Sequence, residues 1–131
     1  MTPRKSKPAA QILIVDDDQL VRDFVVHTLE YGMNQQILAF ESGFDAWQFI
    51  HKEPGKADII IADANIADID GFELLTHVKT MFPEKFFIIT AVDGQLEEAA
   101  RKSNADAFMT KPSDAKDLFA LIRNVTKYYL I

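Results

Sequence analysis

Three carboxylates stand side by side in this chain, directly after a short apolar run. The run is Ile12-Leu-Ile-Val15, and Asp16, Asp17 and Asp18 follow it. Carboxylates held close together repel one another and lose hydration, so such a group either takes up a proton or captures a cation. Mg²⁺ suits best, because one or two carboxylates, waters and phosphate oxygens often hold it. An aspartate in this place also has the chemistry of a helix N-cap, and that alternative stays open for the tripeptide taken alone.

Other polar residues stand where further apolar runs end. They are Asp63 after residues 58–62, Thr90 at the end of residues 86–90 and Lys111 after residues 107–110. Taken singly, Asp63 suits a turn, Thr90 a strand-end hydroxyl and Lys111 a solvated charge. Together with the acidic triplet they form the set of groups that can hold a metal ion and a phosphoryl group. A carboxylate in such a set can accept the phosphoryl group as an acyl phosphate.

Short apolar strands alternate with amphipathic helices along the chain. The expected strands are residues 11–15, 36–40, 58–62, 86–90 and 107–110. The first expected helix carries Val21, Phe24, Val25, Thr28 and Leu29 before a stop at Gly32. The second runs from a cap at Ser42 to Pro54, the third spans 71–81, the fourth spans 95–103, and the fifth ends near Tyr129. Unbroken apolar strands between helices indicate an α/β fold with a doubly wound parallel sheet. Because sites in such sheets lie beyond the carboxyl ends of the strands, Asp16–Asp18, Asp63, Thr90 and Lys111 should converge on one pocket.

The bulk composition fits one soluble domain. The chain has 131 residues, of which 48% are hydrophobic and 26% charged. Residues 1–10, with two prolines and three basic residues, are expected to form a flexible N-terminal arm, and residues 11–131 the folded domain. The net charge of -6 argues against nucleic-acid binding, and zero cysteines exclude thiolate chemistry. No apolar run approaches the roughly 20 residues that span a bilayer, so we expect a cytoplasmic protein without a membrane partner.

Five pieces of the sequence match one family of signalling domains. They are Ile12-Leu-Ile-Val-Asp-Asp-Asp18, Ile61-Ala-Asp63, Asp70-Gly71, Ile88-Ile-Thr-Ala91 and Lys111-Pro112. Through them the chain resembles a receiver domain of the two-component response regulators, of the single-domain CheY-like kind, over about residues 11 to 129. The resemblance implies a flavodoxin-like fold of five parallel strands and five helices, with strand order 2-1-3-4-5.

The resemblance also implies a role for each residue of the site. Asp63 would be the phosphoacceptor, and Mg²⁺ would be held by Asp16, Asp17, Asp63 and the backbone carbonyl of Asn65. Asp18 sits outside the acidic pair and would cap the first helix. The two remaining groups, Thr90 and Lys111, would each bind a phosphoryl oxygen.

The function implied by the resemblance is a phosphoacceptor switch rather than an enzyme. A histidine kinase or phosphotransfer protein would phosphorylate Asp63, and Thr90 would then be drawn inward. Phe108 matches the aromatic switch position whose ring follows, which changes the face made by the fourth helix, the fifth strand and the fifth helix. That face would bind or release a downstream target protein that the sequence does not identify, and phosphorylation-dependent dimerisation is a further option.

The chain departs from the family pattern in three places. Ala67 and Asp68 stand where the family commonly has proline and glycine, which predicts a more mobile or more acidic loop. Phe108 lacks the hydroxyl that a tyrosine would offer. The position two residues after Thr90 is Val92, where some fast-dephosphorylating relatives carry an acid or amide, so we predict a longer-lived phosphoryl group.

A haloacid dehalogenase-like phosphatase is the alternative from another class. That group also has Asp-x-Asp after its first strand, which would make Asp16 the nucleophile, with Thr90 and Lys111 nearby. The alternative lacks a later acidic pair and leaves Asp63 and Asp70-Gly71 unexplained. A flavin-binding module is weaker, because carboxylates would face the flavin phosphate. A receiver that serves only as a scaffold would not need the whole set of site residues.

Overall fold

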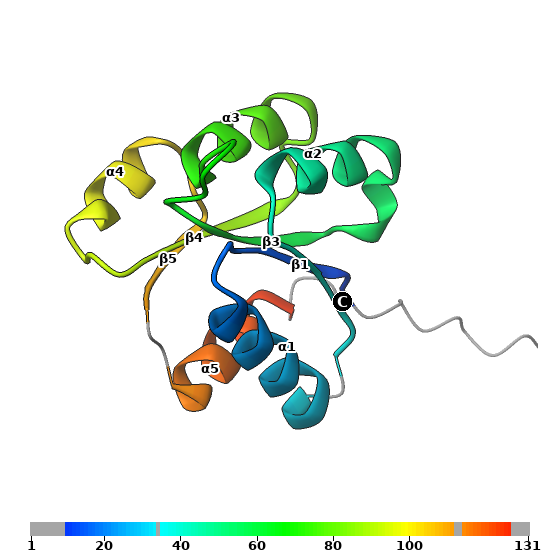
Figure 1. Ribbon diagram of the computed structural model, residues 1–131, viewed down its shortest axis with the longest axis vertical. Helices are drawn as coiled ribbons and strands as arrows, with labels where there is room; N and C mark the ends of the chain where they lie inside the picture. The colour runs from blue at the N-terminus through cyan, green and yellow to red at the C-terminus, as the bar shows by residue number, and fades with distance from the viewer. Residues whose placement is uncertain (1–9, 34, 112–113, 127–131) are drawn as a thin grey trace, which may run out of the picture.

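The computed structural model describes residues 10–33, 35–111 and 114–126, which form one parallel sheet between two layers of helices (Figure 1). The strands are β1 (Ile12–Val15), β2 (Ile37–Phe40), β3 (Ile59–Asp63), β4 (Phe86–Ala91) and β5 (Ala107–Thr110). The helices are α1 (Gln19–Met33), α2 (Gly43–Lys52), the short 3-10 helix η1 (Pro54–Lys56), α3 (Gly71–Met81), α4 (Leu96–Lys102) and α5 (Ala115–Thr126). Residues 1–9 of the expected arm, Pro112 of the matched Lys-Pro pair and the expected helix end at Tyr129 lie outside the described residues.

The sheet has the expected topology. Its strand order is β2-β1-β3-β4-β5 and every neighbouring pair is parallel. The prediction of a doubly wound, flavodoxin-like sheet is therefore confirmed. The strand β1 lies next to the central strand β3, and Asp63 at the end of β3 is in register with Thr90 of β4. The topology thus brings residues from distant parts of the chain to one edge of the sheet.

Both faces of the sheet are buried, which explains the unbroken apolar strands. Successive side chains of a strand point to opposite faces. Accordingly Leu13 and Val15 belong to the core under α2, α3 and α4, whereas Ile12 and Ile14 belong to the core under α1 and α5. Figure 1 shows the same division, with α1 and α5 on one side of the sheet and α2, α3 and α4 on the other. Each fully buried Ile or Leu stabilises the fold by about 1.5–3 kcal/mol, so β1 is a rigid base for the residues that follow it.

The helix bounds agree with the expected ones, except at the end of α1. The helix α3 spans 71–81 as predicted, and α4 is one residue shorter at each end than expected. The prediction that Gly32 ends the first helix was wrong, because α1 continues to Met33. A Cβ atom on Gly32 would lie 2.3 Å from Cζ of Phe119, so this glycine permits close packing against α5. Within the described residues, no helix has both the length and the apolar character needed to cross a bilayer.

Candidate functional site

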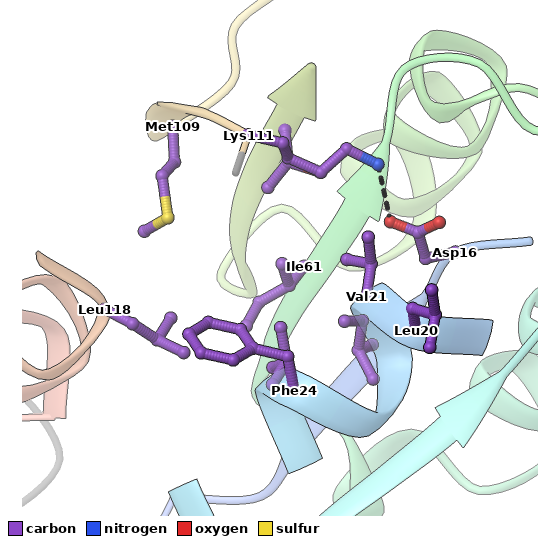
Figure 2. A pocket seen from close by; sticks show the side chains of 11 residues that line it. Asp16, Leu20, Val21, Phe24, Ile61, Met109, Lys111 and Leu118 are labelled. Atoms are coloured by element: carbon purple, nitrogen blue, oxygen red, sulfur yellow. Dashed lines mark hydrogen bonds and ion pairs between the residues drawn. The ribbon is translucent and has the colours of Figure 1, made fainter. Parts of the chain in front are cut away.

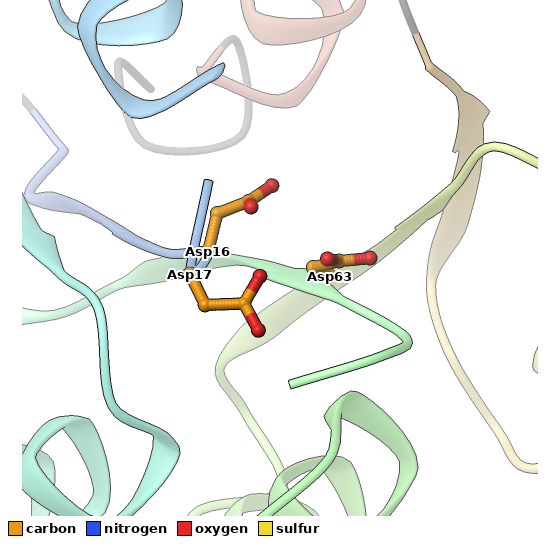
Figure 3. A group of neighbouring side chains, drawn as sticks. All are labelled: Asp16, Asp17 and Asp63. Carbon is orange, nitrogen blue, oxygen red and sulfur yellow. The ribbon is translucent and has the colours of Figure 1, made fainter. Parts of the chain in front are cut away.

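Three carboxylates meet at the carboxyl edge of the sheet. Asp16 and Asp17 follow β1 and Asp63 ends the neighbouring β3, and one carboxylate oxygen from each lies within 4.8 Å of the others. In Figure 3 the side chains of Asp16 and Asp17 leave the end of β1 in different directions, with Asp63 beside them. Asp16 and Asp63 are buried, and Asp17 is exposed. The predicted convergence of these acids is therefore present in the structure.

Lys111 bridges two of the three acids. Its Nζ atom lies 2.8 Å from Oδ2 of Asp16, a contact drawn in Figure 2, and 3.2 Å from Oδ2 of Asp63; the Lys111 side chain is only 11% exposed. The backbone N–H of Lys111 donates to the carbonyl of Ala91 at 2.7 Å, which fixes the chain just after β5. Burial acts to lower the pKa of the Lys111 ammonium, but the hydrogen bond and charge of Asp16 and then of Asp63 outweigh it and raise this pKa. Lys111 therefore stays positively charged at neutral pH.

The acidic cluster suits a divalent cation. Burial raises the pKa of the Asp16 carboxyl, although hydrogen bonds from Lys111 and from the Asp18 N–H oppose the rise. Three carboxylates face one ammonium, which leaves an excess of two negative charges when all are ionised. A hard cation with oxygen ligands would relieve both the repulsion and the cost of burial. The donor set of Asp16, Asp17 and Asp63 thus fits Mg²⁺.

Asp18 lies outside the metal-ligand set and caps α1. Its Oδ1 atom accepts a hydrogen bond from the Leu20 N–H at 2.9 Å, and its own N–H donates to Oδ1 of Asp16 at 2.9 Å. The N-cap alternative therefore holds for this member of the triplet. The hydrogen bond to Asp16 also orients the buried carboxylate of the cluster.

Thr90 and Asn65 both lie next to Asp63. Thr90 is the register partner of Asp63 on β4 and is buried, and its carbonyl accepts a hydrogen bond from Ala64 N–H at 2.8 Å. Asn65 is exposed, and its N–H lies 3.3 Å from Oδ1 of Asp63. Thr90 and Lys111, which were predicted from two other strand ends, and Asn65 therefore lie beside the Asp63 carboxylate.

An apolar cavity of about 280 Å³ opens beside the acidic cluster. Figure 2 shows it between α1 and α5, with Lys111 and Asp16 at one end and Phe24 and Leu118 at the other. Leu20, at its rim, is 80% exposed. Phe24 belongs to the expected apolar face of α1; it lines this cavity and is 40% exposed. The reason is that the cavity separates this part of α1 from α5.

Phe108, the predicted switch residue, lies on β5 facing α4. It is half-buried against the core under α2, α3 and α4, and it lines a second cavity of about 310 Å³ together with Ala100 and Arg101 of α4. Its register partner is Ile89, directly before Thr90. Phe108 therefore lies two strands away from Asp63, across β4, and next to a cavity.

Comparison with known proteins identifies the family. The family model of the response regulator receiver domain matches residues 12–123. The heme response regulator HssR of Staphylococcus epidermidis is 33% identical over 120 residues, which cover 91% of this chain and 52% of that protein. The response regulator protein FleR of Pseudomonas aeruginosa is 29% identical over 117 residues, which cover 87% of this chain and 24% of that protein. The chain thus spans between a quarter and a half of these curated relatives.

A solved structure agrees with this result. The response regulator receiver domain protein from Clostridium thermocellum is 25% identical, and it superposes with a TM-score of 0.83 over 91% of this chain and 95% of its own. Three findings indicate the same family: the family model matches most of the chain, the sheet has the expected strand order, and the relatives are response regulators. The chain belongs to the family of response regulator receiver domains of two-component signalling.

Proposed function

We propose that this domain is a switch that accepts a phosphoryl group on Asp63 from a histidine kinase or a phosphotransfer protein, in the presence of Mg²⁺. The observation that carries the proposal is the bridge made by Lys111, whose Nζ atom contacts both Asp16 and Asp63 beside the exposed Asp17. An acceptor carboxylate, a fixed ammonium and free acidic oxygens are the parts that phosphoryl transfer to a carboxylate requires.

The transfer itself needs little from the protein beyond position and charge. A carboxylate oxygen of Asp63 forms the new O–P bond while the N–P bond of the donor phosphohistidine breaks, and the electron pair stays on the imidazole nitrogen. Lys111 and the Thr90 hydroxyl would each bind a phosphoryl oxygen. Mg²⁺ held by Asp16, Asp17, Asp63 and the carbonyl of Asn65 would neutralise charge on those oxygens. We propose no turnover of an outside substrate, because the product remains on the chain.

The output follows from the charge added at Asp63. A phosphoryl group brings negative charge and acceptor oxygens to the register partner of Thr90, which favours an inward position of this hydroxyl. Phe108 lies beside Ile89, the residue before Thr90, and it borders the cavity against α4. The Phe108 ring can therefore move when Thr90 moves. The face made by α4, β5 and α5 would then exchange between two conformations, and phosphorylation would change their populations. We propose a cytoplasmic setting with a target protein bound or released at this face.

A phosphatase with Asp16 as nucleophile is less well supported. The side chain of Asp16 is 2% exposed and that of Asp63 is 9% exposed. Both oxygens of Asp16 already accept short hydrogen bonds, at 2.9 Å from Asp18 N–H and 2.8 Å from Lys111. The contacts to Asp63 are longer, at 3.3 Å from Asn65 N–H and 3.2 Å from Lys111. Asp63 is thus the more accessible nucleophile.

The direct test is to locate the phosphoryl group. The chain is incubated with acetyl phosphate or phosphoramidate, with MgCl₂ or with EDTA, and the acyl phosphate is trapped by borohydride reduction before peptide mass spectrometry. We expect one modified residue, Asp63, and only with MgCl₂. Modification of Asp16, or equal labelling in EDTA, would contradict the proposed function.

Val92 is expected to make the phosphoryl group long-lived. It is 73% exposed directly after β4, two residues beyond Thr90, and its apolar side chain cannot orient a water molecule for hydrolysis. Val92→Glu should speed dephosphorylation about tenfold, less than the roughly hundredfold of a well-placed base. The measurement is the decay of phosphorylated protein after donor removal. Val92→Leu is the control and should decay like the wild type; an equal rate for Val92→Glu would refute the expectation.

A further inference from the structure

The loop from Ala64 to Asp70 joins the acceptor residue to α3, and its two ends are tied down. The N–H of Ala64 donates to the Thr90 carbonyl at 2.8 Å, and the N–H of Gly71 donates to the Ala64 carbonyl at 3.3 Å. A Cβ atom on Gly71 would lie 2.5 Å from the Asp63 carbonyl oxygen, so the loop closes tightly on its own start. These contacts hold the two ends of the loop; between them the Ile66 side chain is buried in the core, whereas Asn65, Ala67 and Asp68 are exposed.

Asp68 supplies an anchor in the middle of this loop. Its Oδ2 atom accepts hydrogen bonds from the Ser42 hydroxyl at 2.6 Å and from the Phe44 N–H at 3.1 Å, and its Oδ1 atom accepts one from the Gly43 N–H at 3.0 Å. The Ser42 hydroxyl is the main cause that lowers the pKa of the Asp68 carboxyl; partial desolvation opposes it, and the backbone N–H groups of Phe44, Ile69 and Gly43 assist. The carboxylate therefore stays charged, and the three contacts persist, at any physiological pH.

The contact between the loop and α2 is too close to be incidental. A Cβ atom on Gly43 would lie 2.2 Å from the carbonyl oxygen of Ile69, so only glycine fits at the start of α2 in this arrangement. Figure 1 shows α2 and α3 next to each other on one face of the sheet. The helix α2 is packed on the core through Ala46 and Ile50. Asp68 thus ties the loop to a fixed part of the domain.

We propose that Asp68 is a positioning residue for the magnesium site, an inference that rests on the proposed function. Asn65 lies in the same loop, three positions before Asp68, and its N–H faces Asp63 at 3.3 Å. With the loop held on one side of Ala67 by the buried Ile66 side chain and on the other by Asp68, the backbone around Asn65 is set beside the acceptor before the ion arrives. A loose loop would lose conformational entropy on binding the ion, and groups that orient metal ligands indirectly have measurable effects on affinity.

The test measures Mg²⁺ binding in three variants of the whole chain. Asp68→Ala removes all three contacts, and we expect the Kd for Mg²⁺, from calorimetric titration with MgCl₂, to rise about tenfold. Ser42→Ala removes the hydroxyl but keeps the two N–H donors, so a rise of about threefold is expected. Asp45→Asn is the matched control: it removes one exposed negative charge from the first turn of the same helix and should leave the Kd unchanged.

A second readout separates positioning from stability. At saturating MgCl₂ the rate of phosphorylation of Asp68→Ala by phosphoramidate should return to the wild-type rate, with only the half-saturating Mg²⁺ concentration raised. A wild-type Kd in Asp68→Ala, even with lowered stability in urea, would overturn the inference while leaving the proposed function intact. If Asp68→Ala does not fold, a wild-type Kd in Ser42→Ala overturns it. A wild-type chain that binds no Mg²⁺ would overturn both.

Discussion

Asp63→Asn should abolish phosphorylation under conditions in which the wild-type chain is modified on nearly every molecule. An amide nitrogen or oxygen is a far weaker nucleophile than a carboxylate, and no acyl phosphate can form on the variant. The fold should survive, because the Asn amide keeps the shape of the side chain and still has an oxygen that can accept from the Asn65 N–H. Intact-mass measurement after incubation with acetyl phosphate and MgCl₂ gives the result directly.

Two further variants make this result specific. Asp23→Asn changes an exposed acid of α1 and should be phosphorylated like the wild type. Asp16→Asn removes a proposed ligand but not the acceptor, so it should be phosphorylated more slowly and still on Asp63. If Asp16→Asn loses all covalent phosphate while Asp63→Asn keeps it, the phosphatase alternative is correct and the switch is not.

The fold and most of the site were predictable because both depend on local patterns. Apolar strands buried on both faces are hydrophobic at every position, as in Ile12–Val15. This pattern can be recognised in the sequence without any knowledge of distant contacts. The rule that sites lie at the carboxyl ends of parallel strands then brought Asp63, Thr90 and Lys111 together. The structure confirms their proximity through the Lys111 contacts and the register of β3 with β4.

What the sequence did not reveal depends on contacts between distant segments. Gly32 looked like a helix stop, but its role depends on Phe119 of α5, which no local pattern connects to it. Asp68 was expected to make its loop more mobile or more acidic, whereas its carboxylate is bound to the start of α2. Phe24 had the spacing of an inward residue, and only the packing of α5 decides that it borders a cavity. Pairings of this kind follow from the assembled fold.

The second large effect concerns the charge balance of the site. Lys111→Met should lower the free energy of unfolding of the metal-free protein by about 3 kcal/mol at neutral pH, because breaking a buried ion pair leaves the other charge without its partner. The charges left behind are those of Asp16 and Asp63, and the Asp16 side chain, at 2% exposed, is the more buried of the two. Lys79→Met is the matched control, since Lys79 forms a 2.6 Å ion pair with Asp106 away from the acidic cluster.

The pH and Mg²⁺ dependence of this loss identify its cause. Burial already raises the pKa of Asp16 above its ordinary 3.8, and loss of the Lys111 hydrogen bond raises it further. The folded variant then binds a proton more tightly than the unfolded chain, so its stability falls as the pH rises from 3.8 through the folded pKa. Urea titrations of Lys111→Met should therefore show a small loss of unfolding free energy in acid and the full loss at neutral pH.

Because the variant lacks one positive charge beside the acids, MgCl₂ should stabilise it more than the wild type, whereas Lys79→Met should respond to MgCl₂ like the wild type. A deficit that is independent of pH, with no extra stabilisation by MgCl₂, would show that Lys111 does not neutralise the acidic cluster.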